Sequence, residues 1–203
     1  MNRPNIHFRG YCGTVASGRV AKGDKIVVLP SGKGSVVKSI VTSNGELKEA
    51  FTPQAVTLTL EDEIDISRGD TILHEKNVFK STREIEATLV WMNEQKLECG
   101  KQYWIKQTTN TVIGVIEEVE ALINVDTLEE SKTKTLELNE IGKVRVTLNK
   151  ALVIDAYKNN RALGAFIVID RLTNATVAAG MIADQSSEKK PGGLGKLFNF
   201  LRR

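Results

Sequence analysis

Two glycines near the start of the chain have the spacing of a phosphate-binding loop. Gly18 and Gly23 match the glycines of G-x-x-x-x-G-K-[ST], in which backbone amides cradle phosphates and the lysine contacts the β- and γ-phosphates. Here Asp24 follows the second glycine and inverts the required charge. Segment 149–152 lacks the carboxylate of the guanine-binding pattern N-K-x-D, and the Gly-Lys pair within 193–196 follows no expected strand. The sequence therefore predicts no nucleoside triphosphate site of this type.

The histidines and cysteines of the chain have no metal-binding spacing. His7, Cys12, His74 and Cys99 form neither a C-x-x-C nor an H-x-x-x-H pattern, so zinc coordination would require their convergence in space. We expect Cys12, on a glycine-rich strand, to be a small buried residue, and Cys99 to belong to a turn with the glycine that follows it. No metal ligands are predicted.

Two acidic or charged stretches could also suggest chemistry. Segment 61–65 reads Glu-Asp-Glu-Ile-Asp, which could supply paired catalytic acids or calcium ligands, but it lacks the glycine and the spacing of a calcium loop. Residues 68–70 spell the adhesion tripeptide Arg-Gly-Asp in a chain without a secretory signal pattern. Both stretches are predicted to be solvated turns, with Gly69 at positive φ.

The opening stretch 9–28 predicts how the chain begins to fold. Glycines at 10, 13, 18 and 23 separate short β-branched runs, which lets a backbone bend sharply or approach another strand closely. Val20 and the run 26–28 flank a turn in which Gly23 is expected at positive φ. Such a chain is typical of a small closed barrel.

Alternating apolar and polar residues continue as short strands up to the C-terminal region. The alternation of apolar and polar residues lapses over 74–80, which predicts a domain boundary there. Segment 126–134 is expected to be an exposed loop. No long amphipathic helix is expected before 183. We predict an all-β fold of two consecutive small antiparallel β-barrels, over 1–78 and 79–182, followed by a basic tail at 183–203. The expected strands are 25–29, 36–41, 54–60, 71–73, 84–91, 101–107, 112–124, 143–148, 165–170 and 176–182.

Composition limits the function classes. The chain has 203 residues, 41% of them hydrophobic, and a net charge of +3 that arises entirely within 183–203, where five basic residues face two acidic ones. The body is therefore neutral overall, which disfavours nucleic-acid binding, although a local patch remains open. No apolar run approaches the ~20 residues of a membrane span, and two cysteines make no disulfide framework. We expect a soluble cytoplasmic protein.

The tail has a pattern of its own. Leu194, Leu197, Phe198 and Leu201 recur at helical spacing among basic residues. This pattern is compatible with a basic amphipathic helix that contacts a membrane or a partner, and equally with a frayed or self-docked tail, since a two-turn helix is marginal alone.

The motifs also carry a family resemblance. Three patterns resemble the start of the first β-barrel of translation-factor-type GTPases: Gly13-Thr14-Val15, Gly18-x-Val20 and Gly23-Asp24-x-Ile26. Segment 151–182 resembles the end of the large, GTPase subunit of bacterial sulfate adenylyltransferase, with Ala165 where translation factors usually carry arginine and Ile169-Asp-Arg-Leu-Thr-Asn in the sulfate-activation version. The resemblance covers about residues 2–182.

This resemblance implies barrels of the elongation-factor Tu domain 2 and domain 3 type. It further implies an enzyme that couples GTP hydrolysis to adenylyl transfer from ATP to sulfate, with adenylyl transfer performed by a separate small catalytic subunit. GTP and Mg²⁺ are then expected only in an amino-terminal GTPase domain that would precede Met1. In this chain we expect no catalytic, cofactor-binding or metal-binding residues and no fused kinase.

The implied role is a scaffold for the GTPase domain and the small subunit. Two polar loops, 155–161 and 170–174, are candidate partner surfaces because strong strand patterns flank both. The candidate residues are Asp155, Tyr157, Asn160, Arg161, Asp170, Arg171 and Asn174. The loops could instead only close the barrel, with Asn160 and Arg161 bonded internally. Barrels that bind tRNA in a translation-factor relative, or an unrelated structural barrel, remain the alternative functions.

Overall fold

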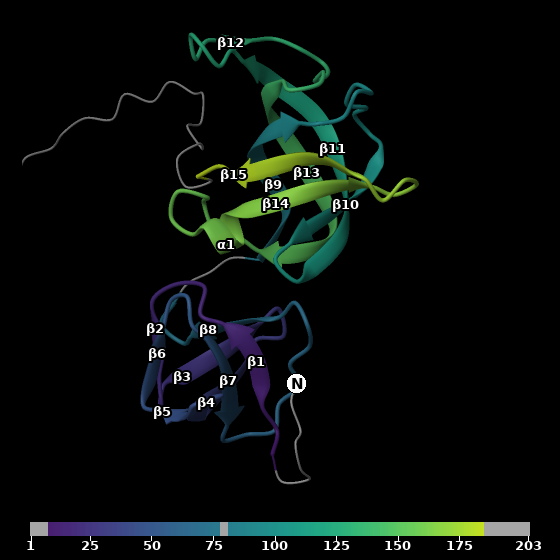
Figure 1. Ribbon diagram of the computed structural model, residues 1–203. Coiled ribbons are helices and arrows are strands. Elements are labelled where there is room, and N and C mark those ends of the chain that lie inside the picture. The colour runs from purple at the N-terminus through teal and green to yellow at the C-terminus, as the bar shows by residue number, and fades with distance from the viewer. Residues whose placement is uncertain (1–7, 78–80, 185–203) are drawn as a thin grey trace, which may run out of the picture.

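The computed structural model describes residues 8–77 and 81–184, which fold almost entirely into β-strands (Figure 1). Within these ranges no helix is long and apolar enough to cross a membrane. Several predictions lie outside the described residues: the resemblance motif at 2–5, the exact boundary between 78 and 79, and the amphipathic pattern of the tail.

The first group of strands encloses its own core. The strand order of the main sheet is β1-β7-β4-β3-β8 with β5 on β4, and β2 pairs with β6. Val28 and Ile40 are fully buried at its centre. The strands are β1 (Tyr11–Thr14), β2 (Arg19–Ala21), β3 (Lys25–Leu29), β4 (Lys33–Thr42), β5 (Gly45–Leu47), β6 (Glu49–Phe51), β7 (Ala55–Leu60) and β8 (Thr71–His74).

The glycine turns of this group are confirmed. Gly23 has φ +88° and Gly69 has φ +97°, both in the left-handed region that glycine adopts without steric cost. The strands on either side of Gly23 do not pair with each other, however, because β2 pairs with β6 while β3 pairs with β4 and β8. The side chain of Asp24 accepts a hydrogen bond from the amide of Ala21 at 2.8 Å. This bond stabilises the turn through which the chain passes from the β2–β6 pair to the main sheet.

The second group of strands forms a larger sheet in the order β10-β14-β15-β9-β13-β11-β12, and β10 also pairs with β11. That extra pairing closes the sheet into a barrel around Trp91 and Tyr103, whose rings meet edge to face at 6.2 Å. The elements are β9 (Ser81–Trp91), β10 (Gln102–Gln107), β11 (Asn110–Ile123), β12 (Glu130–Ser131), β13 (Ile141–Val153), α1 (Arg161–Gly164), β14 (Ala165–Asp170) and β15 (Thr176–Ile182).

Some expectations differ from the structure. The strand expected over 143–148 is longer, since β13 runs from Ile141 to Val153, and the loop 126–134 contains the two-residue strand β12. The prediction that Cys12 is buried is wrong, because Tyr11 faces the core and the next residue of the strand must face outward. The sulfur of Cys12 lies 3.3 Å from the hydroxyl of Thr57. Cys99 does lie in a turn.

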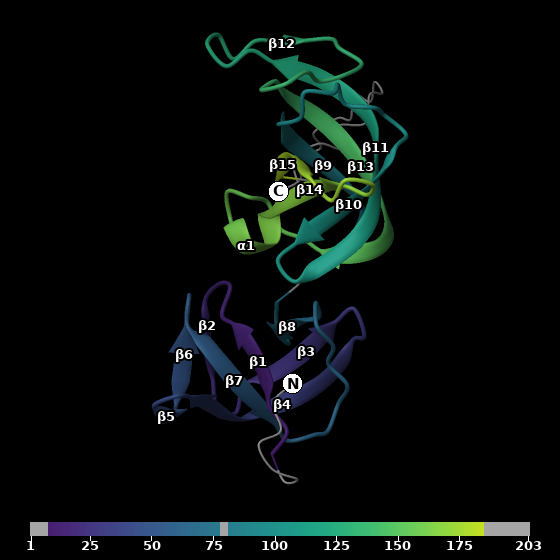
Figure 2. The ribbon, with the colours of Figure 1, turned by 45° about the vertical axis from the view of Figure 1, so that its right-hand side comes forward.

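The two barrels meet through a hydrogen bond between their loops. Asn110, at the start of β11, donates its side-chain amide to the carbonyl of Gly69 at 2.7 Å. A Cβ at Gly69 would lie 2.2 Å from Oδ1 of Asn110, so only glycine allows this approach. In Figures 1 and 2 the barrels stack end to end, with α1 at the end of the second barrel that faces the first.

A tight contact holds the β14–β15 hairpin in the second barrel. Phe166 is buried in the core, and its register partner across the hairpin is Gly180. A Cβ at Gly180 would lie 2.2 Å from the Phe166 ring. The ring therefore occupies the space that any larger residue at position 180 would need.

We predict that Gly180→Ala lowers the free energy of unfolding of the second barrel by about 1–3 kcal/mol, because the new methyl group overpacks the core. Phe166→Leu in the same chain should relieve this clash, so that the double variant costs at least ~1 kcal/mol less than the sum of the single variants. Both tryptophans, Trp91 and Trp104, belong to this barrel, so fluorescence during denaturant unfolding reports on it.

Gly13→Ala is a control on the first barrel, because nothing lies within 4 Å of a Cβ built there. Its unfolding is followed by far-UV circular dichroism, since both tryptophans lie in the second barrel. Strictly additive costs for Gly180→Ala and Phe166→Leu would contradict the assigned clash.

Candidate partner surface

The loop 155–161 is ordered by internal hydrogen bonds. Asn160, 5% exposed, is the N-cap of α1: its side-chain oxygen accepts the amides of Ala162 at 3.0 Å and Leu163 at 3.2 Å. Asp155 accepts the amide of Ala156 at 2.7 Å and the side chain of Asn159 at 3.3 Å. Asn160 is thus bonded internally, as the alternative expectation had it, and it positions the loop rather than facing solvent.

Tyr157 and Arg161 lie at the outer edge of the same loop. The amide of Tyr157 donates to the carbonyl of Ile182 at 3.0 Å, which fixes the loop to the end of β15. The guanidinium of Arg161 lies 5.9 Å from the centre of the Tyr157 ring, a cation–π distance. Arg161 is exposed and Tyr157 is partly buried, and Lys158 and Asn159 between them are exposed as well.

The turn 170–174 is built around the buried carboxylate of Asp170. Its Oδ1 accepts the amides of Leu172 at 2.8 Å and Thr173 at 2.9 Å, and its Oδ2 pairs with the ammonium of Lys101 at 3.0 Å. Asn174 completes the turn at φ +57°, a left-handed conformation that asparagine tolerates. Hydrogen bonds from the Thr173 amide, the Lys101 ammonium and the Leu172 amide hold the pKa of Asp170 well below its ordinary value.

This turn presents side chains outward in a fixed geometry. Arg171 donates a hydrogen bond to Gln102 and places its guanidinium 5.0 Å from the centre of the Trp104 ring. Leu172 is 88% exposed at the tip of the turn.

The two predicted loops lie at opposite ends of one hairpin. α1 leads into β14 and the 170–174 turn leaves it, so about 17 Å of strand separates them at ~3.4 Å per residue (Figure 1). The structure therefore brings Asp155, Tyr157, Asn160 and Arg161 together at one end. It brings Asp170, Arg171 and Asn174 together at the other.

Between these ends lies a partly buried, mostly apolar surface, which we call the hairpin wall. It consists of outward-facing residues of β9, β10, β14 and β15: Val90, Trp104, Lys106, Ala165, Ile167, Ile169, Ala179 and Met181. The register places Lys106 beside Ile167, Ile167 beside Ala179, and Ala179 beside Val90. An open depression of about 510 Å³ lies over this row, and Tyr157 contributes to its rim.

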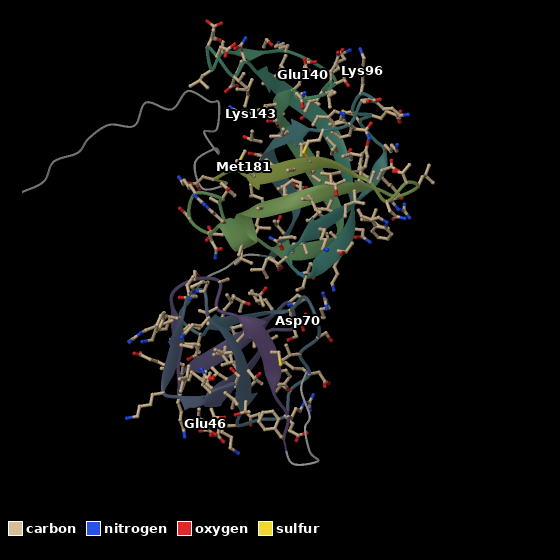
Figure 3. The ribbon with its side chains drawn as sticks, in the orientation of Figure 1. Glu46, Asp70, Lys96, Glu140, Lys143 and Met181 are labelled. Carbon is tan, nitrogen blue, oxygen red and sulfur yellow. The ribbon has the colours of Figure 1, made fainter. Side chains whose placement is uncertain are left out.

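The neighbouring wall of the barrel is different in character. Over β11 and β13 the outward residues include several charged ones, and Arg145 pairs with Glu118 and Glu120 while Lys143 pairs with Glu130. Figure 3 shows Met181 on β15 and Lys143 nearer to β12. The surface over β11 and β13 thus carries ion pairs, whereas the hairpin wall is mostly apolar.

Sequence reasoning missed the hairpin wall, although a signal was present. β14 reads Ala-Phe-Ile-Val-Ile-Asp, without the polar residues that a solvent-facing strand normally alternates with its core residues. A strand that is apolar on both faces is typical of one that is covered on both sides. Among the described residues no cluster of three or more histidine, cysteine or acidic side chains could hold a metal ion.

Comparisons with known proteins agree with the β-barrel architecture. The family described as GTP-eEF1A C-terminal domain-like matches residues 84–183. The crystal structure of sup35 complexed with GDP superimposes with a TM-score of 0.77 at 16% identity, over 87% of this chain and 45% of that one. This likeness shows the fold alone.

Curated proteins are much closer in sequence. Sulfate adenylyltransferase subunit 1 of Teredinibacter turnerae is 55% identical over 181 residues, which are 89% of this chain and 39% of that protein. The bifunctional enzyme CysN/CysC of Rhodopirellula baltica is 53% identical over 187 residues, 92% of this chain and 29% of that protein. The chain thus spans well under half the length of these relatives.

We predict that the 170–174 turn makes the second barrel acid-sensitive. Because the pKa of Asp170 is lowered on folding, its carboxylate stabilises the folded state above ~pH 4, the ordinary range of an aspartate, and this contribution is lost as pH falls further. Asp170→Asn should therefore be less stable than the parent chain at pH 6, and the difference should shrink steadily toward pH 2.5.

Thermal unfolding followed by tryptophan fluorescence measures this difference. Lys101→Met is the companion variant: it removes the ion pair but keeps the amide donors, so it should retain most of the pH dependence. A stability difference for Asp170→Asn that stays constant from pH 6 to pH 2.5 would rule out this role.

Proposed function

Since this chain belongs to the family of sulfate adenylyltransferase subunit 1, of which it spans about two fifths, we propose that its barrels are a non-catalytic frame within the enzyme. In this proposal the complex forms adenylyl sulfate and pyrophosphate from ATP and sulfate, driven by GTP hydrolysis. The frame carries the small catalytic subunit and the GTPase domain, and GTP and Mg²⁺ bind in that domain rather than on the barrels.

The hairpin wall is the observation that carries this proposal. A row of partly buried apolar residues on a barrel surface, next to a wall that carries ion pairs, is suited to contact with another protein. The name subunit 1 of the relatives implies at least one further subunit as such a partner. Both predicted loops border the wall, so a partner that covers it would touch Arg161 at one end and Arg171 at the other.

Isothermal titration calorimetry with the small catalytic subunit tests the proposal, with a generic tRNA as the competing ligand. We expect saturable binding of the subunit and none of the tRNA. Salt-sensitive binding of tRNA alone would favour the translation-factor alternative. Absence of binding to both would mean that these barrels do not carry the assembly contact.

We further predict that Arg161→Ala and Arg171→Ala each weaken subunit binding about fivefold, or about 1 kcal/mol, because each removes an arginine stacked on an aromatic ring at the edge of the contact. Unchanged melting temperatures would establish that the variants remain folded. Normal affinity in both folded variants would argue against the two loops as the contact.

A further inference from the structure

The hairpin wall has an unbalanced charge as well as an apolar surface. Lys106 stands in the middle of its central row, beside Ile167. Arg161 and Arg171 stand at its two ends, on aromatic rings. Within 8–77 and 81–184, none of these three cations is paired with a carboxylate, whereas Arg145 on the neighbouring wall pairs with two.

The acidic residues at the ends of the wall are already engaged. Asp170 pairs with Lys101 at 3.0 Å and accepts backbone amides, and Asp184 pairs with Lys158 at 2.5 Å. Asp155 accepts the amide of Ala156 and the side-chain amide of Asn159. They therefore offer little charge to compensate Lys106, Arg161 and Arg171. Compensation would have to come from the molecule that covers the wall.

The shape of the wall limits what can cover it. Its depression of about 510 Å³ falls within the ~300–1,000 Å³ of ordinary binding pockets, but it is open and shallow. Most of its lining residues are apolar residues of β14 and β15, and Tyr157 and Lys106 also line it. This shape fits two or three apolar side chains that project from a protein segment.

We propose that the hairpin wall binds a protein segment whose apolar residues are flanked by carboxylates. The apolar residues fill the depression over Ile167 and Ala179, and the carboxylates pair with Lys106, Arg161 and Arg171. This inference rests on the proposed function for the identity of the partner, the small catalytic subunit, but it concerns the chemistry of the contact. Oppositely charged pairs at the edge of an apolar contact raise the association rate and fix the orientation.

Charge disfavours the chain's own tail as the occupant. The tail carries Lys196, Arg202 and Arg203 around its apolar residues, which would bring like charges to the wall. A nucleic acid would be attracted by the cations, but the rings of Tyr157 and Trp104, on which its bases could stack, already lie beside Arg161 and Arg171. A second copy of the barrel would present the same cations again.

The first test uses Lys106→Glu with the small catalytic subunit as the probe. We expect binding to weaken at least tenfold, and Ile167→Ser to weaken it about fivefold at unchanged melting temperature. Lys150→Glu is the matched control, since Lys150 is exposed on β13 away from the wall and its substitution changes the net charge equally. Normal binding by Lys106→Glu and Ile167→Ser would overturn the inference while the proposed function stands.

The second test does not depend on that subunit. Two synthetic peptides share the same leucines and phenylalanine, and their flanking residues are glutamates in one and lysines in the other. Fluorescence anisotropy should show preferential binding of the acidic peptide to the parent chain, and Lys106→Glu should remove the preference. If the subunit fails to bind but this preference holds, the inference stands and the proposed partner is wrong; equal binding, or none, overturns the inference.

The same assay separates the other occupants. If Phe198→Ser in the full chain tightens peptide binding, the tail occupies the wall and the inference is overturned. A concentration-dependent dimer that Lys106→Glu dissociates would assign the wall to a second copy, with the same consequence.

Discussion

The contact between the Phe166 ring and Gly180 is the constraint on which the second barrel depends. It fixes the β14–β15 hairpin between β10 and β9, where the hairpin completes the barrel around Trp91 and Tyr103. The inner face of the hairpin is filled by Phe166 together with Val168, Ala178 and Ile182. The residues that alternate with them, among them Ile167, Ala179 and Met181, face outward. The apolar hairpin wall is therefore a consequence of how the barrel closes.

Different hydrogen-bonding side chains stabilise the two ends of the hairpin. At one end Asn160 caps a single helical turn, and at the other Asp170 gathers amides and an ammonium around its carboxylate. Both side chains are buried, and both leave an arginine beside them stacked on an aromatic ring. The loops thus act as rigid borders of the wall, which is what a frame for other subunits requires.

Sequence patterns predicted most strands because period-two alternation is a local property. They could not predict which strands pair: the register partners of β2 in β6 and of β3 in β8 lie 28 to 48 positions away, and nothing within the turn at Gly23 encodes them. The one-turn helix α1 was not predicted, because four residues are too few to show a helical periodicity. The candidate loops were identified by their polarity, but the wall between them was not, since Lys106 and Met181 become neighbours of one depression only after the barrel closes.

The pairing of β9 with β15 has a consequence for synthesis of the chain. Trp91 lies opposite Ala178, and Ala87 lies opposite Ile182, so the first strand of the second barrel receives its last neighbour from the end of the described chain. On the ribosome, one edge of β9 therefore remains open until roughly ninety further residues have emerged. This barrel cannot close before β15 has emerged, and until then the exposed edge of β9 is where a chaperone or a misdirected strand would meet the nascent chain first.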